Sequence, residues 1–384
     1  MDAYTYLDHA ATTPTRPEVT EAVVECWTRD FGNPSSTHRA GRQARKRLEE
    51  ARRRVAAALG TTQDSVLFVR GGTESDNLAL LGWARHRRSA GTTPVVLTSA
   101  VEHPAVREAA GRVAGEGGVH RVVPVDPETG LDLDALVDAL QEAALVSCMW
   151  VNNETGLVLP IDEVVTRAHG AGAVVHSDAV QAVGKVPVRL DETAVDLLTV
   201  TGHKIYGPRG TGVLVNHGGI PLAPLHVGGG QERGFRPGTE DVAGAVGFAV
   251  ALELAVAEQG AESLRMATIR DSLAALIVKW DSRVRVNGGE LSRAPHILSL
   301  GIPDVEADTL LAALDMAGFA ASGGSACSSG SAAPASTVQA LYGPSDPLTT
   351  LRLSFGKATR EGDVERIARR VAEACDRVRQ QAVA

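Results

Sequence analysis

The chain has 384 residues, enough for two domains, and its hydrophobic share of 44% is ordinary for a globular protein. A formal net charge of -8 argues against general affinity for nucleic acid or for anionic membrane surfaces, since both attract positive potential. The four cysteines form no C-x-x-C pair, so neither a disulfide framework nor a metal site is expected. The first residues, MDAYTYLDHAATTP, do not resemble a signal peptide, and the expected location is cytoplasmic.

Two amphipathic helices are predicted first, at 16–31 and 39–59, the second ended by Gly60. Apolar runs and helical stretches then alternate along the chain. This alternation is typical of an α/β fold with a doubly wound, mostly parallel sheet, which binds ligands beyond the carboxyl ends of its strands. The predicted strands are 66–69, 95–100, 120–125, 144–151, 173–179 and 196–202, and the helices between them include 133–142 and 161–171.

The pattern changes near residue 259, which predicts a large domain at 14–258 and a smaller α+β domain at 259–384, with the N-terminal segment 1–13 packed on the smaller one. An apolar run at 242–252 is too short to cross a bilayer and indicates a buried helix. Beyond it we expect a helix at 261–280, short strands in VRVNG and HILSLGI, a helix at 307–317, a strand in TLRLSFG and a final helix.

Lys204 stands in TGHKIYGPRGTG, directly after an apolar strand, in a chain that has only five lysines. An arginine-rich chain keeps lysine either by indifference or for amine chemistry that a guanidinium cannot perform. An amine at a strand end suits a Schiff base to an aldehyde cofactor. A surface lysine in a glycine-rich turn is an equally good interpretation of this stretch alone.

Other polar residues follow the ends of predicted strands. Asp178 ends the run GAVVHSDA, where a carboxylate needs a cationic partner such as a protonated pyridine nitrogen, or else caps the next helix. Thr73 follows a Gly-Gly turn at a helix start, a place that binds phosphate. His103 and Asn153 follow two further strands, although His103 is also compatible with a purely structural role. Together these residues predict a site at one edge of the sheet.

Cys327 lies in SGGSACSSGSAAP, which offers almost no large side chain to bury a thiol. Gly-Ser-rich composition is typical of flexible chain, whereas a structural cysteine usually packs among apolar neighbours. We therefore interpret Cys327 as a nucleophile on a movable loop. The other cysteines lie in predicted core positions, where packing is the expected role.

Nine motifs together strongly resemble the cysteine desulfurases of the NifS/IscS type. These are enzymes of the class-V, fold-type I superfamily that depend on pyridoxal phosphate (PLP). The resemblance runs nearly end to end and implies a homodimer that takes sulfur from L-cysteine, leaves L-alanine and passes the sulfur to an acceptor protein. The motifs are YLDHAATTP, FGNPSSTHRAG, RGGTESDN, VEHPAV, VNNETG, HSDAVQAVGK, TGHKIYGPRGTG, GGGQERGFRPGTED and SGGSACSSG.

The resemblance implies cofactor roles for residues that match the family's motifs. Lys204 matches the Schiff-base lysine and Asp178 the partner of the pyridine nitrogen. His103 matches the imidazole stacked on the ring, and Gln181 and Asn153 the contacts around its phenolic oxygen. The matches to phosphate-binding residues are Gly72, Thr73, Thr201 and His203, with Thr239 reaching the phosphate of the other protomer.

The resemblance also implies catalytic roles. Arg352, with Asn153, matches the group that binds the substrate carboxylate, a task that suits a bidentate guanidinium. Without the family, an arginine on the wet face of an edge strand is the better interpretation. Cys327 matches the thiol that attacks the substrate sulfur and becomes a persulfide, while Lys204 and His103 are candidates for moving protons.

Several alternatives stay open. One is a selenocysteine lyase or another fold-type I PLP enzyme, although an aminotransferase needs no protein thiol such as Cys327. Another is a silent homologue that serves as a binding module in a sulfur-transfer complex. The acceptor pathway is open between iron–sulfur cluster assembly and DNA phosphorothioation, whose desulfurase the sequence also resembles. The arginine-rich stretches 39–54 and 85–89 are read as solvated helix faces, so no direct nucleic-acid binding is expected.

Overall fold

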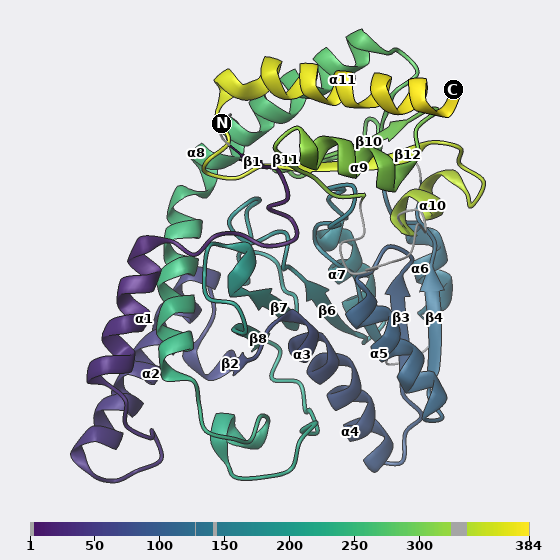
Figure 1. The fold of residues 1–384 in the computed structure, drawn as a ribbon. Helices are drawn as coiled ribbons and strands as arrows, with labels where there is room; N and C mark the ends of the chain where they lie inside the picture. The colour runs from purple at the N-terminus through teal and green to yellow at the C-terminus, as the bar shows by residue number, and fades with distance from the viewer. Residues whose placement is uncertain (1–3, 127, 141–143, 324–335, 384) are drawn as a thin grey trace.

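The computed structural model describes residues 4–126, 128–140, 144–323 and 336–383. Its largest element is a seven-stranded sheet (Figure 1) in which β8 alone runs antiparallel to its neighbours. The predicted mostly parallel sheet is therefore confirmed, but β8 was missed by the sequence analysis. The strands in spatial order are β2 (Val66–Val69), β8 (Gly212–Asn216), β7 (Leu197–Thr201), β6 (Val174–Asp178), β5 (Leu145–Ser147), β3 (Val95–Ser99) and β4 (Val119–Val123).

Both faces of this sheet are buried. Since successive residues of a strand point to opposite sides, neighbouring residues pack in different hydrophobic clusters. Leu197 packs in one cluster, with Trp83 and Val106, whereas Leu198 packs in another, with Val55 and Phe248. The helices are α1 (Pro17–Arg29), α2 (Arg39–Leu59), α3 (Gly72–Asn77), η2 (Leu78–Gly82), α4 (Trp83–Ser89), α5 (Pro104–Gly115), α6 (Leu133–Ala139), α7 (Ile161–Gly170) and α8 (Val242–Trp280). The 3-10 turns are η1 (Gln63–Ser65), η3 (Gly202–Lys204), η4 (Gln231–Gly234) and η5 (Glu361–Asp363).

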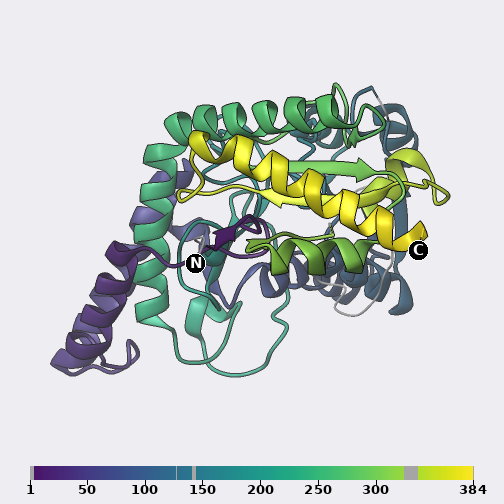
Figure 2. The same ribbon diagram turned by 45° about the horizontal axis from the view of Figure 1, so that its top comes forward.

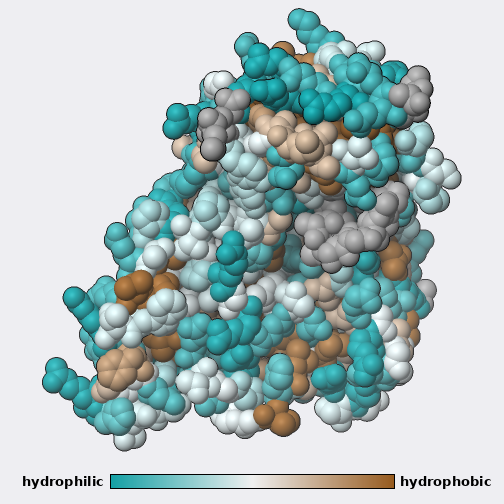
Figure 3. All heavy atoms as spheres, in the orientation of Figure 1, coloured by the Kyte–Doolittle hydropathy of each residue, from teal (hydrophilic) through white to brown (hydrophobic). Residues whose placement is uncertain are grey.

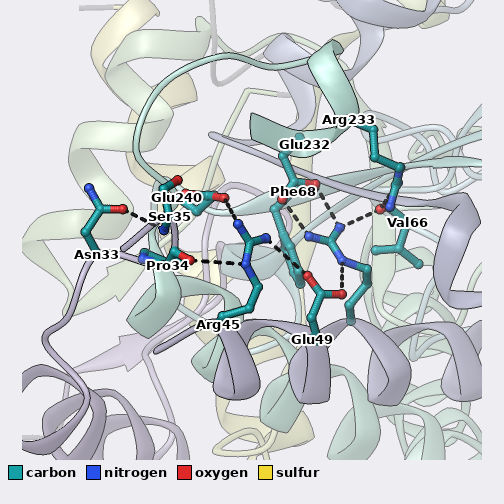
Figure 4. A network of polar contacts seen from close by, with 11 residues as sticks. Asn33, Pro34, Ser35, Arg45, Glu49, Val66, Phe68, Glu232, Arg233 and Glu240 are labelled. Atoms are coloured by element: carbon teal, nitrogen blue, oxygen red, sulfur yellow. Dashed lines mark hydrogen bonds and ion pairs between the residues drawn. The ribbon is translucent and has the colours of Figure 1, made fainter. Parts of the chain in front are cut away.

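The outer edge of β2 is covered by a network of charged side chains (Figure 4). The backbone oxygen of Val66 accepts hydrogen bonds from Arg52 and Arg233 at 2.7 Å each, and the N–H of Phe68 donates to Glu232 at 3.0 Å. Glu232 also forms a buried ion pair with Arg52 at 2.6 Å. Because these side chains satisfy the strand's outward backbone groups, the edge offers no free template for pairing. The network also fixes the start of segment 231–241.

Helix α8 joins two predicted elements into one. It passes without a break through the predicted domain boundary, along α1 and α2 in its first half and along α11 (Val364–Val383) in its second (Figure 1). By length and composition it is the one helix of the described chain that could cross a membrane, but 56% of its most apolar window is buried inside the protein. It is therefore a core helix.

A second hydrophobic cluster lies around a three-stranded antiparallel sheet. Helices α9, α11 and the second half of α8 surround this sheet (Figure 2), and the cluster includes Ile269, Phe355 and also Leu7 from the N-terminal segment. The division into domains at 14–258 and 259–384 stays a prediction. The elements are β12 (Thr349–Ser354), β10 (Ile297–Ile302), β9 (Arg285–Val286), α9 (Ala307–Met316), α10 (Ser336–Tyr342), α11 (Val364–Val383), and the parallel pair β1 (Thr5–Tyr6) and β11 (Phe319–Ala320).

Candidate active site

A cavity of about 320 Å³ opens at the carboxyl ends of the sheet strands. This volume is at the lower end of the range of small-molecule pockets. Polar side chains from five strand ends meet at the cavity, together with residues from the N-terminal segment and β12. Its lining residues are Ala10, Ala11, Gly72, Thr73, Asp76, His103, Met149, Asn153, Asp178, Val180, Gln181, Thr201, His203, Lys204 and Arg352.

Chain direction explains why these residues meet. Asp178 is the last residue of β6 and Thr201 the last of β7, and Lys204 ends the 3-10 turn that follows β7. His103 and Asn153 follow β3 and β5, which run parallel to β6. Thr73 follows β2, which is parallel to these strands because β2 and β7 both run antiparallel to β8. Parallel strands end at the same edge, so five separate strand ends deliver polar groups to one place.

The amine of Lys204 closes the cavity against the N-terminal segment. Its Nζ donates to the backbone oxygens of Ala10 and Ala11 at 2.6 Å each. Gln181 Nε2 donates to the same oxygen of Ala10 at 2.8 Å. The amine and the amide are thus held side by side by one carbonyl group, both at the cavity wall.

Two carboxyl groups face the cavity from buried positions. Burial raises the pKa of Asp178, while the nearby His103 and Lys204 act in the opposite direction. Burial, followed by the charge of Asp178, raises the pKa of Asp76 well above its ordinary value. Asp178 accepts a hydrogen bond from the N–H of Val180 at 2.9 Å, but Oδ1 of Asp76 has no hydrogen-bond partner among the described residues. Such a pair favours a cation or an N–H donor in the cavity.

The two cavity histidines have different constraints. Nδ1 of His103 accepts a hydrogen bond from the N–H of Ala105 at 3.1 Å, so it caps α5 and, in the neutral ring, leaves the proton on Nε2. His103 therefore both caps α5 and lines the cavity. Burial, together with Lys204 and Arg209, lowers the pKa of His203 to about 4, so that ring is neutral near pH 7.

Arg352 is buried, not on a wet strand face. Only 1% of its side chain is exposed, and it pairs with Asp8 at 2.8 Å and donates to the backbone oxygen of Asn153 at 2.7 Å. Because a buried guanidinium needs a counter-charge, Asp8 stabilises Arg352 in this buried position. The sequence analysis missed Asp8, although it lies in the quoted motif YLDHAATTP.

His296 was also missed, since it gives no signal beyond one polar residue before an apolar strand. It is buried directly before β10, and its Nε2 lies 3.0 Å from Oε1 of Gln181. An amide oxygen only accepts, so Nε2 of His296 is the donor. This contact turns the amide nitrogen of Gln181 toward Ala10 and the cavity.

One residue assigned to the site, Thr239, is not part of the lining of this cavity. This residue is exposed. Cys327 lies outside the described residues. The other three cysteines, Cys26, Cys148 and Cys375, are all buried, and burial raises each pKa, to about 11 for Cys26 and about 12 for Cys375. They are poor nucleophiles, since only a thiolate attacks.

Within the described residues, no group of three His, Cys, Asp or Glu side chains is arranged to hold a metal ion. The donors at the cavity are instead an amine, hydroxyls, imidazoles and buried carboxyls. This set fits PLP: a lysine for the aldehyde, Asp178 for the ring nitrogen, and hydroxyls at the start of the helical run from Gly72 for the phosphate. The desolvation of Asp178 is the kind of cost that a cationic ring N–H offsets.

Comparisons with known proteins agree with this chemistry. The family model for aminotransferase class-V matches residues 5–367. The cysteine desulfurase IscS of Dictyoglomus turgidum is 40% identical over 366 residues, which span 95% of this chain and 92% of that protein. A solved NifS-like protein has a TM-score of 0.89 at 30% identity, covering 97% of this chain and 99% of its own. DndA from Streptomyces lividans has a TM-score of 0.74 at 33% identity, and the match covers 91% of this chain and 99% of that chain.

Proposed function

Because the chain belongs to the class-V aminotransferase family, we propose that it is a PLP-dependent cysteine desulfurase, which takes sulfur from L-cysteine, releases L-alanine and forms a persulfide on Cys327. The observation that carries this proposal is the joint presence of the Lys204 amine, the buried Asp178 carboxyl and the buried Arg352 guanidinium at one cavity. These three groups suit an amino-acid substrate bound to an aldehyde cofactor.

PLP, when bound, supplies an electron sink next to the α-carbon of the substrate. Lys204 would hold its aldehyde carbon, Asp178 its ring nitrogen, His103 one face of its ring, and Gln181 and Asn153 its ring oxygen. Gly72, Thr73, Thr201 and His203 would bind its phosphate. A neutral His203 suits this role, because it donates one hydrogen bond without adding a charge that Lys204 would repel.

The chain's own residues then carry out the remaining steps. Arg352 binds the substrate carboxylate, and Asn153, whose backbone oxygen accepts a hydrogen bond from Arg352, orients this carboxylate. Lys204 Nζ takes the α-proton, and His103 is the group that moves the proton of the substrate thiol. The Cys327 thiolate attacks the substrate sulfur, an S–S bond forms as the C–S bond breaks, and the electron pair stays on the carbon. That carbon, Cβ, takes up a proton and the α-carbon regains the proton that Lys204 removed, so that alanine leaves and Cys327 holds the persulfide.

We infer that the active form is a homodimer. Thr239 is exposed and lies apart from the cavity of its own chain, as a residue that serves a partner's phosphate must. The charged network of Figure 4 holds the start of its segment rigidly. Apolar side chains also lie on the outer face of α1 (Figure 3, left), where Val24 and Trp27 are 47% and 65% exposed and an open groove of about 760 Å³ includes Val24. A second copy would cover this surface.

We propose a protein as the sulfur acceptor, in the cytoplasm. The similarity to IscS proteins favours iron–sulfur cluster assembly, and the similarity to DndA favours DNA phosphorothioation. In either pathway the net charge of -8 favours action through a partner protein over direct binding to DNA or to a membrane. Persulfide labelling of partners in the native cell, read by mass spectrometry, distinguishes the two pathways.

The primary test uses Lys204→Ala and Cys327→Ala. Lys204→Ala loses the yellow colour of the covalently held cofactor and all turnover, because no other amine lines the described cavity. Cys327→Ala keeps the colour and loses sulfide release from L-cysteine. Sulfide release at the normal rate by Cys327→Ala would overturn the assignment of the thiol. A colourless wild-type protein that takes up no PLP would favour the silent homologue, and turnover of L-selenocysteine alone would favour the lyase.

A further inference from the structure

The turn that carries Asn153 is built around one buried amide. Oδ1 of Asn152 accepts hydrogen bonds from the N–H groups of Glu154 and Thr155 at 3.0 and 2.8 Å, and from the Thr155 hydroxyl at 2.9 Å. A side-chain oxygen that holds the next backbone N–H groups fixes the conformation of the residue between them. The position of Asn153, the candidate ligand of cofactor and substrate, is therefore set by Asn152.

The same amide reaches two other parts of the protein. Its Nδ2 donates to the backbone oxygen of Val101 at 3.0 Å and to the Thr337 hydroxyl at 2.9 Å. Val101 lies two residues before His103, and Thr337 lies in the first turn of α10. One fully buried side chain thus joins the turn of Asn153, the loop of His103 and helix α10.

Glu154 strengthens the link to α10. Its carboxylate, which is only 5% exposed, accepts from the N–H of Thr337 at 2.7 Å and from the Ser336 hydroxyl at 3.2 Å. Arg107 of α5 donates to the Ser336 hydroxyl at 3.3 Å. Burying a carboxylate is costly unless hydrogen bonds compensate, and an apolar side chain would pack a short helix at lower cost. These hydrogen bonds to Glu154 therefore fix the location of α10 against the turn of Asn153.

Helix α10 is the point at which the chain returns from the stretch that contains Cys327. Ser336 is nine residues after Cys327 in sequence, and Ser322 is five residues before it. Ser322 is itself paired with Arg352 through two backbone hydrogen bonds, of 3.2 and 2.7 Å. Both ends of the stretch are thus attached next to candidate substrate-binding residues, the first beside Arg352 and the second beside Asn153.

We propose that Asn152 and Glu154 are positioning residues for sulfur transfer: they fix the return end of the Cys327 stretch to the turn of Asn153, so that the thiol is delivered in register with the bound substrate. This inference rests on the proposed function and deepens it. Two stages of the reaction then depend on different parts of the protein. Substrate binding and α-proton removal depend on the cavity, whereas S–S bond formation also depends on the α10 attachment.

The test follows both steps in the PLP-loaded enzyme after mixing with L-cysteine in a single turnover. The cofactor absorbance change reports substrate binding and proton removal, and mass spectrometry of Cys327 reports the persulfide. In Glu154→Ala we expect the persulfide rate to fall about 10- to 100-fold, the scale expected for misplacing a reacting group by about 1 Å. We expect the absorbance change to stay within about twofold, because the cavity lining is intact.

Glu154→Gln and Ser336→Ala are the graded variants. Gln keeps an acceptor for the Thr337 N–H, and Ser336→Ala removes only the hydroxyl contacts with Glu154 and Arg107, so each is expected to lower the persulfide rate about two- to fivefold. Glu163→Ala, on the exposed face of α7, removes the same charge elsewhere and is expected to change neither rate. These variants keep the test valid if Glu154→Ala does not fold.

Two results would overturn the inference. If both rates fall together in Glu154→Gln, then Glu154 supports the cavity as a whole. If Glu154→Ala and Ser336→Ala leave the persulfide rate unchanged, then α10 does not position the thiol. Failure of the proposed function looks different, since the wild-type protein would then form no persulfide at all.

Discussion

One wall of the cavity is made of residues at the ends of sheet strands, here called the sheet wall, and the other, here called the second wall, comes from the N-terminal segment and β12. The sheet wall contains His103, Asn153, Asp178 and Lys204. The second wall contains Ala10, Ala11 and Arg352, with Asp8 and His296 behind them. In the sheet wall each residue lies at the end of its own strand or in the segment that follows it. In the second wall each residue depends on contacts between segments that are distant in sequence.

This difference corresponds to a difference in proposed task. The sheet wall offers the groups that suit the cofactor, and the second wall offers the guanidinium that suits the substrate carboxylate. Hydrogen bonds join the walls from Lys204 to Ala10 and Ala11, from Gln181 to Ala10, and from Arg352 to Asn153. Because the two walls are held by different packing, changes in the second wall are expected to alter substrate binding. Changes in the sheet wall are expected to alter cofactor chemistry or stability.

The largest effect is expected from Arg352→Gln. Removing a buried guanidinium leaves Asp8 unpaired, a change that typically costs about 3–5 kcal/mol, and it removes the partner of the substrate carboxylate. We expect kcat/KM for L-cysteine to fall about 100- to 1000-fold, mostly through KM, with PLP still bound. The control is Arg379→Gln, which removes another paired arginine, on α11, and is expected to leave KM unchanged. Loss of PLP in Arg352→Gln would show that the walls do not act separately.

The second-largest effect is expected on the free energy of unfolding and concerns Glu102. This residue is fully buried and precedes His103 of the sheet wall. Burial raises its pKa to about 8, opposed by hydrogen bonds from Ser99 and the N–H of Met149. Between pH 4.5 and 8 the folded protein keeps this proton and the unfolded chain does not. The free energy of unfolding therefore falls as pH rises through this window, by at most about 1.4 kcal/mol per pH unit.

Glu102→Gln cannot lose a proton and isolates this contribution. We expect its free energy of unfolding, relative to the wild-type protein, to increase steadily from pH 5 to pH 8 and then to level off. Urea denaturation of both PLP-loaded proteins at each pH measures the difference. A constant difference across the window would mean that Glu102 is ionised in the folded protein.

The same comparison explains what the sequence could predict. Asp178, Lys204, His103 and Asn153 follow apolar runs, and a strand end is a local signal that places a residue at one edge of a parallel sheet. Arg352 was assigned only through the family resemblance, and Asp8 and His296 were missed. Their burial arises from contacts with residues about 115 to 345 positions away, and no local pattern reports such contacts.

The fold shows the same limit. The parallel strands and α2, which ends at Gly60 with φ +69°, follow from periodicity and breaker residues. Strand β8 was missed because it is a short run among glycines, and its antiparallel pairing with β2 and β7 is set by the sheet. Helix α8 was predicted as two pieces, because its first half is buried all round and its second half is amphipathic. Continuity of the helix is a property of packing against α1, α2 and α11.

A third prediction sharpens the role of the second wall. Asp8→Asn keeps the shape of the residue and a hydrogen bond to Arg352 but removes the counter-charge. We expect the free energy of unfolding to fall by about 1 kcal/mol, the difference between a charge-assisted and a neutral hydrogen bond. We also expect KM for L-cysteine to fall about two- to fivefold, since the guanidinium then presents more of its charge to the substrate carboxylate. Steady-state kinetics and urea denaturation check both parts, and a rise in KM would show that Asp8 positions Arg352 more than it neutralises it.

The smallest effect is expected from His296→Leu, which tests whether the second wall also reaches the cofactor. The neutral His296 ring, whose pKa burial lowers well below its ordinary value, donates to Gln181 and so directs the Gln181 amide nitrogen into the cavity. Without that donor the amide can rotate, and its oxygen then faces the backbone oxygen of Ala10. We expect the dissociation constant for PLP to rise about threefold, with the pH dependence of the cofactor absorbance displaced, while His296→Gln, which keeps an N–H donor, recovers most of both. An unchanged absorbance profile in His296→Leu would confine the second wall to substrate binding, because the orientation of Gln181 would then not depend on β10.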